Sequence, residues 1–389
     1  MKRSLVALAV GTFALGIAEF GMMGILDTVS ESLGVSIVAG GNLISLYSLG
    51  VAVGAPMLLL WRNMPLKRLM LTLSAVICLG NLAAALAPGF GAMLCARFVS
   101  GLPHGAYFGA GAILCTRLAS AGGGASAVAV MVGGMTLANL AGVPLATLVS
   151  NLFGWRYVFG AVAVTGLCAF AAIWSFVPKV APLPVTGMKG QFRFLRKPAP
   201  WLIYAGVFFG QASVYCWLSY IEPIMTRVTG FTTADMTWIM MLAGLGMVVG
   251  NALSGHLADR YGVARVTAWI AASLIIVMPL LYLLSGSKVA SLPLMFIATA
   301  SLFGIGGPLQ FLIVRYATGG EMLGGAGIQI AFNVSNAISA AVGGLVIHLG
   351  LGLASPALVG VPFAAIGSLA LFTLWRRYDR GRSLPSQGD

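Results

Sequence analysis

The sequence predicts an all-α integral membrane protein with twelve transmembrane helices in two pseudo-symmetric six-helix bundles. Composition and the length of the apolar runs both lead to this fold class. Of the 389 residues, 59% are hydrophobic and only 8% are charged, and the mean hydropathy is +0.98. A soluble domain needs many more charged residues to cover its surface, so we expect lipid to surround this chain. Because a backbone in lipid has to satisfy its own hydrogen bonds, the spanning segments must be helices.

The apolar runs are about 20 residues or longer, which is enough to cross a hydrocarbon core about 30 Å thick. Charges, prolines and glycine clusters separate them. We expect helices at 5–27, 37–61, 67–87, 91–117, 125–151, 157–178, 200–222, 235–257, 266–286, 292–316, 325–349 and 355–376. The first run follows Lys2 and Arg3 as a signal peptide would. It is too long for one, contains Glu19 and lacks a clear cleavage site, so we expect it to be retained.

Basic residues predict the orientation. If the N-terminus is cytoplasmic, every Lys and Arg except Arg97, Arg156, Arg227 and Lys288 falls in a cytoplasmic loop or tail. Such a bias is typical of multi-pass proteins and predicts that both termini are cytoplasmic. It also explains the net charge of +13 without a nucleic-acid partner.

No cofactor, metal site or enzyme pattern is expected. The three histidines, including His104, are isolated, and the sequence has no Ser/His/Asp or P-loop pattern. Five cysteines lie inside apolar runs without CxxC spacing, so neither disulfides nor a metal is implied. They are Cys78, Cys95, Cys115, Cys168 and Cys216.

A basic connector divides the chain into similar halves. Residues 179–199 carry five basic residues and no acidic one, and separate a bundle at 1–178 from a bundle at 200–378, with 379–389 as a short cytoplasmic tail. The two halves show an internal repeat at an offset of about 196, since Gly50–Gly54 reappears as Gly246–Gly250, and Gly133 to Asn139 as Gly327 to Asn333. Duplicated halves are common in alternating-access carriers, whose site lies near the midplane between them.

Particular residues resemble a known family. Gly255 to Gly262, followed by Arg265, resembles the GxLADRxG loop of the major facilitator superfamily, and Arg97 to Gly101 is similar to the RxxxG core of its fourth helix. The first-half copy of the loop is degenerate at Trp61 to Pro65, where Asn63 takes the place of Asp259.

A narrower resemblance lies in the first and fifth spans. Gly16 to Phe20 with Gly24 is similar to the twelve-span drug/proton antiporter branch, and Gly134, Gly142 and Pro144 resemble its antiporter motif. Over nearly the whole chain, the sequence resembles the bacterial arabinose-inducible efflux permease group of sugar and drug exporters. This resemblance implies a monomeric, proton-driven exporter of the bacterial inner membrane, with a drug-like or sugar-like substrate. It also implies that Asp259, Arg260, Arg265, Gly142 and Pro144 serve the conformational switch.

Glu19 is the first candidate for proton coupling. It lies about 14 residues into the first span, roughly 20 Å from the cytoplasmic end. A carboxylate at this depth is costly and is a functional candidate, although it could instead bond a neighbouring helix. Arg97 is expected at a similar depth, where it could pair with Glu19 or brace helices by binding carbonyls. Asp27 could relay protons to Glu19, or be a solvated residue at the end of the span beside Glu31.

Polar and aromatic residues at membrane depth are candidates for the substrate cavity. Their side chains are costly in lipid, so they should face the interior, as ligands or as contacts between helices. They are His104, Tyr107, Phe108, Asn139, Gln211, Tyr215, Trp217, Gln310, Gln329, Asn333 and Asn336.

Two other functions remain open from the sequence. An uncoupled sugar or nucleoside exporter would use the Asn and Gln side chains more than Glu19. A membrane sensor would bind a ligand without moving it, although no appended signalling domain supports this. The sequence thus predicts a transporter and leaves its substrate undetermined.

Overall fold

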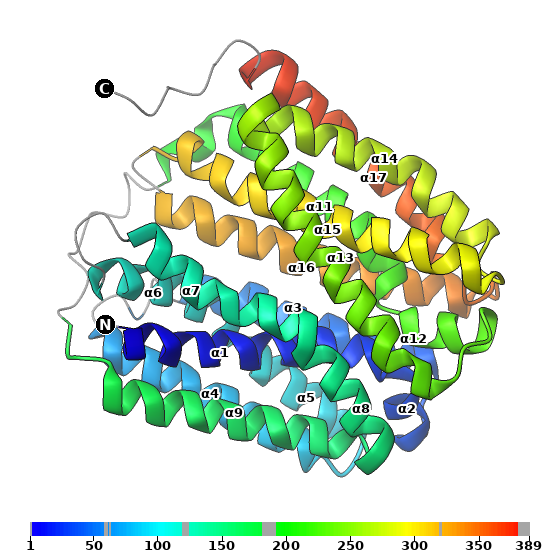
Figure 1. The fold of residues 1–389 in the computed structure, drawn as a ribbon, viewed down its shortest axis with the longest axis horizontal. Helices are drawn as coiled ribbons and strands as arrows, with labels where there is room; N and C mark the ends of the chain where they lie inside the picture. The colour runs from blue at the N-terminus through cyan, green and yellow to red at the C-terminus, as the bar shows by residue number, and fades with distance from the viewer. Residues whose placement is uncertain are drawn as a thin grey trace. The chain divides into compact units, whose positions relative to one another are not determined.

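The computed structural model describes residues 2–57, 61, 64–118, 124–180, 192–318 and 321–379. Every regular element in these ranges is a helix (Figure 1). The elements before the connector are α1 (Lys2–Phe20), η1 (Gly21–Gly24), α2 (Leu26–Ser32), α3 (Ile37–Met57), α4 (Leu66–Ala85), α5 (Phe90–Gly101), α6 (Pro103–Leu118), α7 (Gly124–Leu137), η2 (Ala138–Gly142), α8 (Val143–Phe153) and α9 (Trp155–Phe176).

The elements after the connector begin with a short turn and continue with long helices. They are η3 (Arg193–Arg196), α11 (Pro198–Leu218), α12 (Ile221–Pro223), η4 (Ile224–Val228), η5 (Thr233–Asp235), α13 (Met236–Tyr261), α14 (Val263–Leu283), α15 (Lys288–Tyr316), α16 (Glu321–His348), α17 (Pro356–Leu374) and η6 (Trp375–Asp379).

Eleven helical segments of the described chain are long and apolar enough to cross a membrane. The predicted span that is missing from this set, 91–117, is present as two helices, α5 and α6, which meet at Leu102. Pro103 begins α6, and because proline has no backbone N–H it cannot continue the hydrogen-bond ladder. With this broken span included, the arrangement agrees with the predicted twelve.

Two predicted spans end earlier in the structure. Helix α1 ends at Phe20 rather than 27, and Asp27 lies in the first turn of the separate helix α2. Helix α11 ends at Leu218 rather than 222, so Glu222 lies beyond it, in the short helix α12. Both acidic residues therefore lie outside the helices that cross the membrane.

The fifth span contains a π-helical segment, η2, between α7 and α8. The backbone N–H of Val143 donates to the carbonyl of Ala138, five residues earlier. Pro144 follows and has no N–H to donate, which favours the wider turn at this point. The Gly142 and Pro144 pair noted in the sequence therefore marks an irregular place in the helix.

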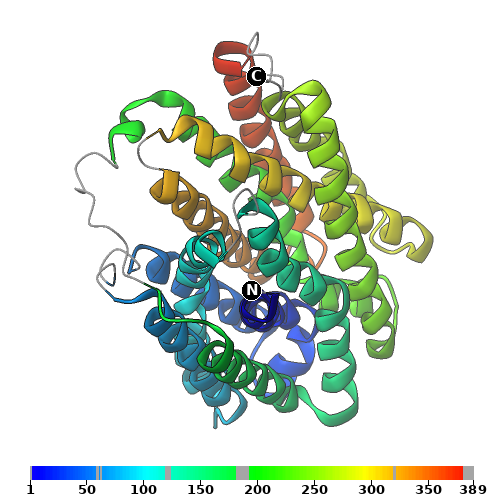
Figure 2. The ribbon, with the colours of Figure 1, turned by 60° about the vertical axis from the view of Figure 1, so that its left-hand side comes forward.

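The described chain separates into two compact units. Unit 1 holds residues 1–186, 220–227 and 231–244, and unit 2 holds 187–219, 228–230 and 245–389. In unit 1, α4 packs along α9 and α1 along α7, and in unit 2 α17 lies beside α11 and α14 (Figures 1 and 2). The predicted bundle boundaries at 178 and 200 stay a prediction, since residues 181–191 of the connector, and 380–389 of the tail, lie outside the described residues.

The glycine repeat of the sequence is also a repeat of packing. A Cβ on Gly50 or Gly54 would overlap the carbonyl oxygens of Phe98 and Leu102. In unit 2, a Cβ on Gly250 would likewise overlap the carbonyl oxygen of Ala300. Glycine is therefore needed at matching places in both halves, because two helix backbones touch there.

Candidate functional site

Glu19 lies in α1 and is 1% exposed. Neither of its carboxyl oxygens has a hydrogen-bond partner among the described residues. The nearest ionisable partner is His104, whose Nε2 lies 3.7 Å from Glu19 Oε2. A buried polar group without a hydrogen bond is costly, so this carboxyl group requires an explanation beyond packing.

His104 is held in place by two aromatic residues. Its Nδ1 lies 3.0 Å from the hydroxyl of Tyr47 in α3, and its ring stacks on Phe108 with 5.3 Å between the centroids. With Nδ1 bonded to Tyr47, the ring directs Nε2 towards Glu19. Tyr47, His104 and Glu19 therefore lie in a row, which we call the Glu19 row, with a hydrogen bond between the first two and ion-pair distance between the last two.

Arg97 is bound to main-chain carbonyls in this region. Its Nη1 donates to Ala18 O at 2.7 Å and its Nε to Leu43 O at 3.2 Å. The guanidinium also lies 4.3 Å from the centroid of the Tyr47 ring. No ion pair joins Arg97 to Glu19 among the described residues, so here the arginine braces α1 and α3 beside the carboxylate. Of the two expected roles, carbonyl binding is the one that this geometry displays.

The fifth span packs closely against α1. A Cβ on Gly134 would overlap Ala9 O, and one on Gly142 would lie 2.7 Å from Ile17. Between them, Asn139 is buried, and its Oδ1 has no partner among the described residues. The residues of the antiporter-like motif therefore place α7, η2 and α8 against the helix that carries Glu19.

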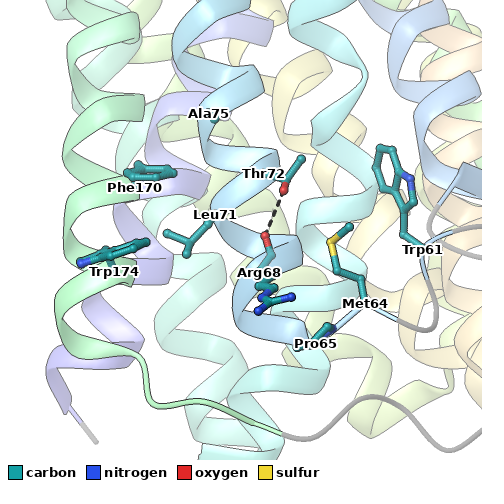
Figure 3. Close-up of a pocket in the computed structure, with 9 residues that line it drawn as sticks. All are labelled: Trp61, Met64, Pro65, Arg68, Leu71, Thr72, Ala75, Phe170 and Trp174. Atoms are coloured by element: carbon teal, nitrogen blue, oxygen red, sulfur yellow. Dashed lines mark hydrogen bonds between the residues drawn. The ribbon is translucent and has the colours of Figure 1, made fainter.

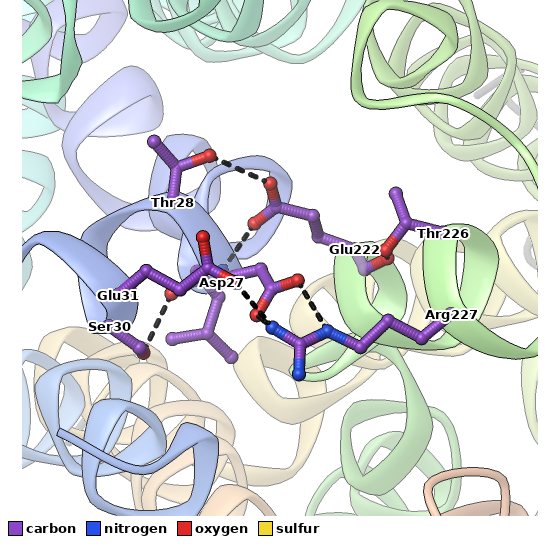
Figure 4. Close-up of polar contacts among 8 residues, drawn as sticks. Asp27, Thr28, Ser30, Glu31, Glu222, Thr226 and Arg227 are labelled. Atoms are coloured by element: carbon purple, nitrogen blue, oxygen red, sulfur yellow. Dashed lines mark hydrogen bonds and ion pairs between the residues drawn. The ribbon is translucent and has the colours of Figure 1, made fainter.

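A second polar cluster lies in unit 1 around α2, and we call Asp27, Glu31, Glu222 and Arg227 the α2 cluster (Figure 4). Arg227 donates to both oxygens of Asp27 and, from Nη2, to Glu31 Oε1 at 2.8 Å. Asp27 was predicted to be either a proton relay or a solvated end residue. Its side chain is 14% exposed and accepts a bidentate hydrogen bond from Arg227, so it is paired as well as partly solvated, and its relay role stays a prediction.

Glu222 is the buried member of the α2 cluster. It is 1% exposed, and it accepts hydrogen bonds from the backbone N–H of Asp27 at 2.6 Å and the hydroxyl of Thr28 at 3.2 Å. Burial raises the pKa of the Glu222 carboxyl to about 8, against the lowering effect of the Asp27 amide bond. Glu222 can therefore change its protonation state near neutral pH.

The remaining cavity candidates divide between the units. In unit 1, Tyr107 is buried and its hydroxyl donates to Leu8 O at 3.2 Å, which makes it a contact between helices. In unit 2, Trp217 is buried, and the ring of Tyr215 meets Phe332 edge-on at 5.5 Å. The cavity role of these side chains stays a prediction.

Amide side chains in unit 2 have unused hydrogen-bonding groups. Gln211 donates to Leu302 O at 3.3 Å and Asn333 to Gln329 O at 3.0 Å. Among the described residues, the side-chain oxygens of Gln211, Gln310 and Asn333, and both polar side-chain atoms of Asn336, have no partner. These atoms could bind a polar ligand.

An open groove of about 770 Å³ runs along α4 and α9 (Figure 3). The rings of Phe170 and Trp174 face it from α9, and Arg68, Leu71 and Thr72 from α4. None of the predicted site residues lines this groove. In the part of the chain that the structure describes, no group of three or more His, Cys, Asp or Glu side chains could hold a metal ion.

Comparison with known proteins assigns the family. Residues 8–326 match the Major Facilitator Superfamily. The chain belongs to the Major Facilitator Superfamily. It is 44% identical over 381 residues to AraJ, a candidate transporter of Escherichia coli strain K12, which covers 97% of this chain and 96% of AraJ. The chain is thus a multi-span membrane transporter and not an enzyme.

Two further proteins are similar to the chain in sequence or in fold. The chloramphenicol resistance protein of Streptomyces lividans is 28% identical over 357 residues, which cover 90% of each chain. The crystal structure of a bacterial homologue of the human lysosomal transporter Spinster superposes with a TM-score of 0.74 at 17% identity, over 98% of each chain. The identity to the Spinster homologue supports the fold alone.

The loop motif of the superfamily lies at the end of α13. Its last glycine, Gly262, has φ of +90°, a value that favours glycine, and it ends the helix. Arg260 lies over the ring of Tyr261 at 5.3 Å and Arg265 over that of Trp375 at 5.4 Å. The side chain of Asp259 is outside the described residues, as are Arg62 and Asn63 of the first-half copy. The switch role of these superfamily residues therefore stays a prediction.

In this superfamily member, the sequence did not identify Tyr47 or Arg227 as site residues. Glu222, near the outer end of the seventh predicted span, has the same two interpretations from sequence as Asp27, a proton relay or a solvated end residue. Tyr47 had no distinguishing signal, because it is one aromatic residue in an apolar span. Arg227 had a signal, since it is among the few basic residues on the predicted outer side, where Asp27, Glu31 and Glu222 also fall. Opposite charges in loops of that side suggest an ion pair between them.

Proposed function

We propose that this transporter exports a small molecule by alternating access in exchange for protons, and that Glu19 carries the exchanged proton. The observation that carries the proposal is the Glu19 carboxyl group, which is 1% exposed and accepts no hydrogen bond from the described residues. A carboxyl group in such a place is more costly when charged than when neutral. A conformational change that admits water or a donor would alter this balance, and so would couple movement to proton binding.

The neighbours of Glu19 support this role. His104 lies within 3.7 Å and is oriented by Tyr47, so it can share a proton with the carboxyl group. Arg97 is tied to Ala18 O, the residue adjacent to Glu19, and to Leu43 O in another helix. Relative movement of α1 and α3 would therefore change the distance between the guanidinium charge and the carboxylate.

The direction of transport rests on similarity. The relative from Streptomyces lividans is named for chloramphenicol resistance, which export of the drug would explain. We extend the export direction, and a drug-like or sugar-like substrate, to this chain as part of the proposal. The proposal also includes a monomer in the bacterial inner membrane with both termini cytoplasmic, the proton gradient as the energy source, and no cofactor.

Proteoliposomes with a preformed pH gradient test the coupling. Cationic dyes, phenicols, nucleosides and sugars are added in turn to wild-type protein, to Glu19→Gln and to Glu31→Gln. Glu31 provides a matched Glu to Gln control, because its side chain is 71% exposed and it lies in α2 rather than in the helix that carries Glu19. We expect a substrate to dissipate the gradient with wild type and Glu31→Gln but not with Glu19→Gln. Coupled export by Glu19→Gln would refute the role of Glu19.

A second candidate, an uncoupled exporter of sugars or nucleosides, is favoured by the amides of unit 2. Asn336 is fully buried, and neither polar atom of its side chain has a partner among the described residues. Amides hydrogen-bond hydroxyl-rich ligands well, since each both donates and accepts. In that case Asn336→Leu should raise the KM for a sugar or nucleoside more than about tenfold, while Glu19→Gln should leave transport unchanged.

A further inference from the structure

We infer that Glu222 is a second proton-binding residue, and that its protonation holds residues 220–227 against α2 at the outer end of the transporter. The inference rests on the proposed function for its place in the transport cycle, and on the α2 cluster for its chemistry. The outer end is the end remote from the basic loops, as the distribution of Lys and Arg predicts.

Two sets of contacts join these segments, which are almost 200 residues apart in sequence. Glu222 accepts hydrogen bonds from the Asp27 amide at 2.6 Å and from the Thr28 hydroxyl at 3.2 Å. Arg227 binds the carboxylates of Asp27 and Glu31 (Figure 4). Asp27 takes part in both sets, through its amide and its carboxylate. Residues 220–227 are thereby held against α2 within unit 1.

The charges of the cluster are unbalanced. Asp27 and Glu31 share the one cation, Arg227, and no basic side chain of the described residues lies within ion-pair distance of Glu222. Helix α12, which carries Glu222, packs against α2 and η1, and η1 (Gly21–Gly24) has no titratable side chain. Among the described residues, Asp27 is the charged group that acts directly on Glu222, and Glu31 and Arg227 complete the cluster around it.

The neutral carboxyl group fits this place better than the charged one. A protonated Glu222 can still accept from the Asp27 amide with Oε2, while an O–H on Oε1 donates to the Thr28 hydroxyl, which turns to accept it. Ionised Glu222 keeps both bonds but adds a second uncompensated negative charge beside Asp27 in a buried position. Protonation therefore removes a repulsion without breaking a contact.

The sign of the pH effect follows from the raised pKa of Glu222. This pKa is about 8 in the form where residues 220–227 contact α2, which we call the fastened form, against an ordinary value of 4.5. Because the fastened form binds the proton more tightly, protons favour it. The contribution is complete below a pH of about 4.5 and is lost as the pH rises through about 8. Low pH therefore favours the contact between residues 220–227 and α2, and high pH weakens it.

This sign matches the order of steps in proton-driven export. After the substrate leaves on the outer side, α2 and residues 220–227 are apart, and Glu222 meets water that is in contact with the outer medium. Uptake of a proton there neutralises Glu222 and lets the two segments come together, which closes the outer side. Glu222 thus links outer proton concentration to the return step, while Glu19 carries the exchanged proton.

Distance measurement by electron spin resonance tests the inference without any transport assay. Spin labels are placed at Ser32 of α2, which is exposed, and at Thr226, a half-buried residue of the segment 220–227 whose hydroxyl donates to Glu222 O in the same segment. The native cysteines are first replaced. In wild type, we expect two populations of label-to-label distance. The ratio of the short-distance population to the long-distance population should fall at least about tenfold between pH 6 and pH 9. A constant ratio in this wild-type protein would overturn the inference by itself.

Variants identify the titrating group. Glu222→Gln has an amide that donates to Thr28 and accepts from Asp27, so it imitates the protonated acid and should keep the short distance at every pH. Glu31→Gln removes an exposed charge of the same cluster and should keep the pH transition. A transition that persists in Glu222→Gln, or one that disappears in Glu31→Gln, would assign the proton to another group and refute the inference.

Glu19→Gln in the labelled protein separates this inference from the proposed function. Among the described residues, Glu19 forms no hydrogen bond or ion pair with the α2 cluster, so we expect the transition to remain in this variant. If coupling survives Glu19→Gln but the transition is present, the proposed function fails and the proton site at Glu222 stands. If Glu19→Gln loses coupling but wild type shows no pH transition, the proposed function stands and the proton site at Glu222 fails.

Discussion

Arg97 places two of its nitrogens on main-chain carbonyls and its guanidinium over the ring of Tyr47, and it forms no ion pair with Glu19 among the described residues. The guanidinium reaches Ala18 O in α1 and Leu43 O in α3 from two different nitrogens. A buried cation that is already hydrogen-bonded can stay in place whether or not a nearby carboxylate is charged. The same residue therefore stabilises the fold and keeps a constant charge beside the coupling site.

We expect Arg97→Lys to lower the thermal stability of the purified protein. One ammonium group cannot reproduce the two divergent hydrogen bonds of the fork, and losing one that involves a charged group costs about 1.5–3 kcal/mol. Arg156→Lys is the control, since Arg156 is exposed, donates to Ala87 O at 3.1 Å and lies over the ring of Trp155. Arg156→Lys should lower the unfolding free energy by about 0.5 kcal/mol or less. Equal losses in thermal unfolding would contradict the bracing role.

Helix pairs are fixed by glycines at matching places of the two halves. Gly54 in α3 meets the carbonyl of Leu102, and Gly250 in α13 meets that of Ala300. Both contacts are with backbone, which cannot move aside as a flexible side chain can. The close approach of these helices therefore depends on the missing Cβ.

Gly54→Ala and Gly250→Ala should each destabilise the protein by about 1–3 kcal/mol, as overpacking against a rigid neighbour does. Gly255→Ala in α13 is the matched control, because a Cβ there would have open space. Gly255→Ala should leave the unfolding free energy unchanged or raise it by about 0.5–1 kcal/mol through helix propensity. Thermal unfolding in detergent measures all three, and a loss confined to one half would show that the packing repeat is not equivalent.

The end of α13 depends on the conformation of one residue. Gly262 has φ of +90°, which a residue with a Cβ adopts only with strain. Gly262→Ala should therefore cost about 1–2 kcal/mol in unfolding free energy. Comparison with Gly255→Ala in the same helix isolates the backbone effect. Unchanged stability would mean that the glycine of the loop motif serves the conformational switch rather than the helix end.

At the scale of the whole molecule, the sequence predicts the fold class well because lipid imposes it. Apolar runs of the required length must be helices, so the spans were found to within a few residues at most ends. The breaks were harder to predict. Pro103 and Pro144 both allow a break, yet the first divides the fourth span and the second accompanies a π-turn, and the difference depends on packing with neighbouring helices.

The site was less predictable, because its members meet only in three dimensions. Depth in the span identified Glu19 as a candidate, but nothing in the sequence places Tyr47 against His104 or Glu222 against Asp27. Pairs so far apart in sequence are set by how whole helices pack. Local pattern relates more directly to local structure, since Thr232 and Asp235 have the spacing of a capping box and form one.

Orientation is the property on which the direction of every proposed proton step depends, and thiol labelling in intact cells tests it. With Cys95 and Cys168 replaced, since both are exposed, we expect Ser32→Cys to react with a membrane-impermeant reagent added outside. Arg68→Cys, an exposed position at the basic end, should react only after permeabilisation. The reverse pattern would put the α2 cluster on the cytoplasmic side. Glu222 would then bind protons from the cytoplasm, and the closure that acid favours would oppose proton-driven export.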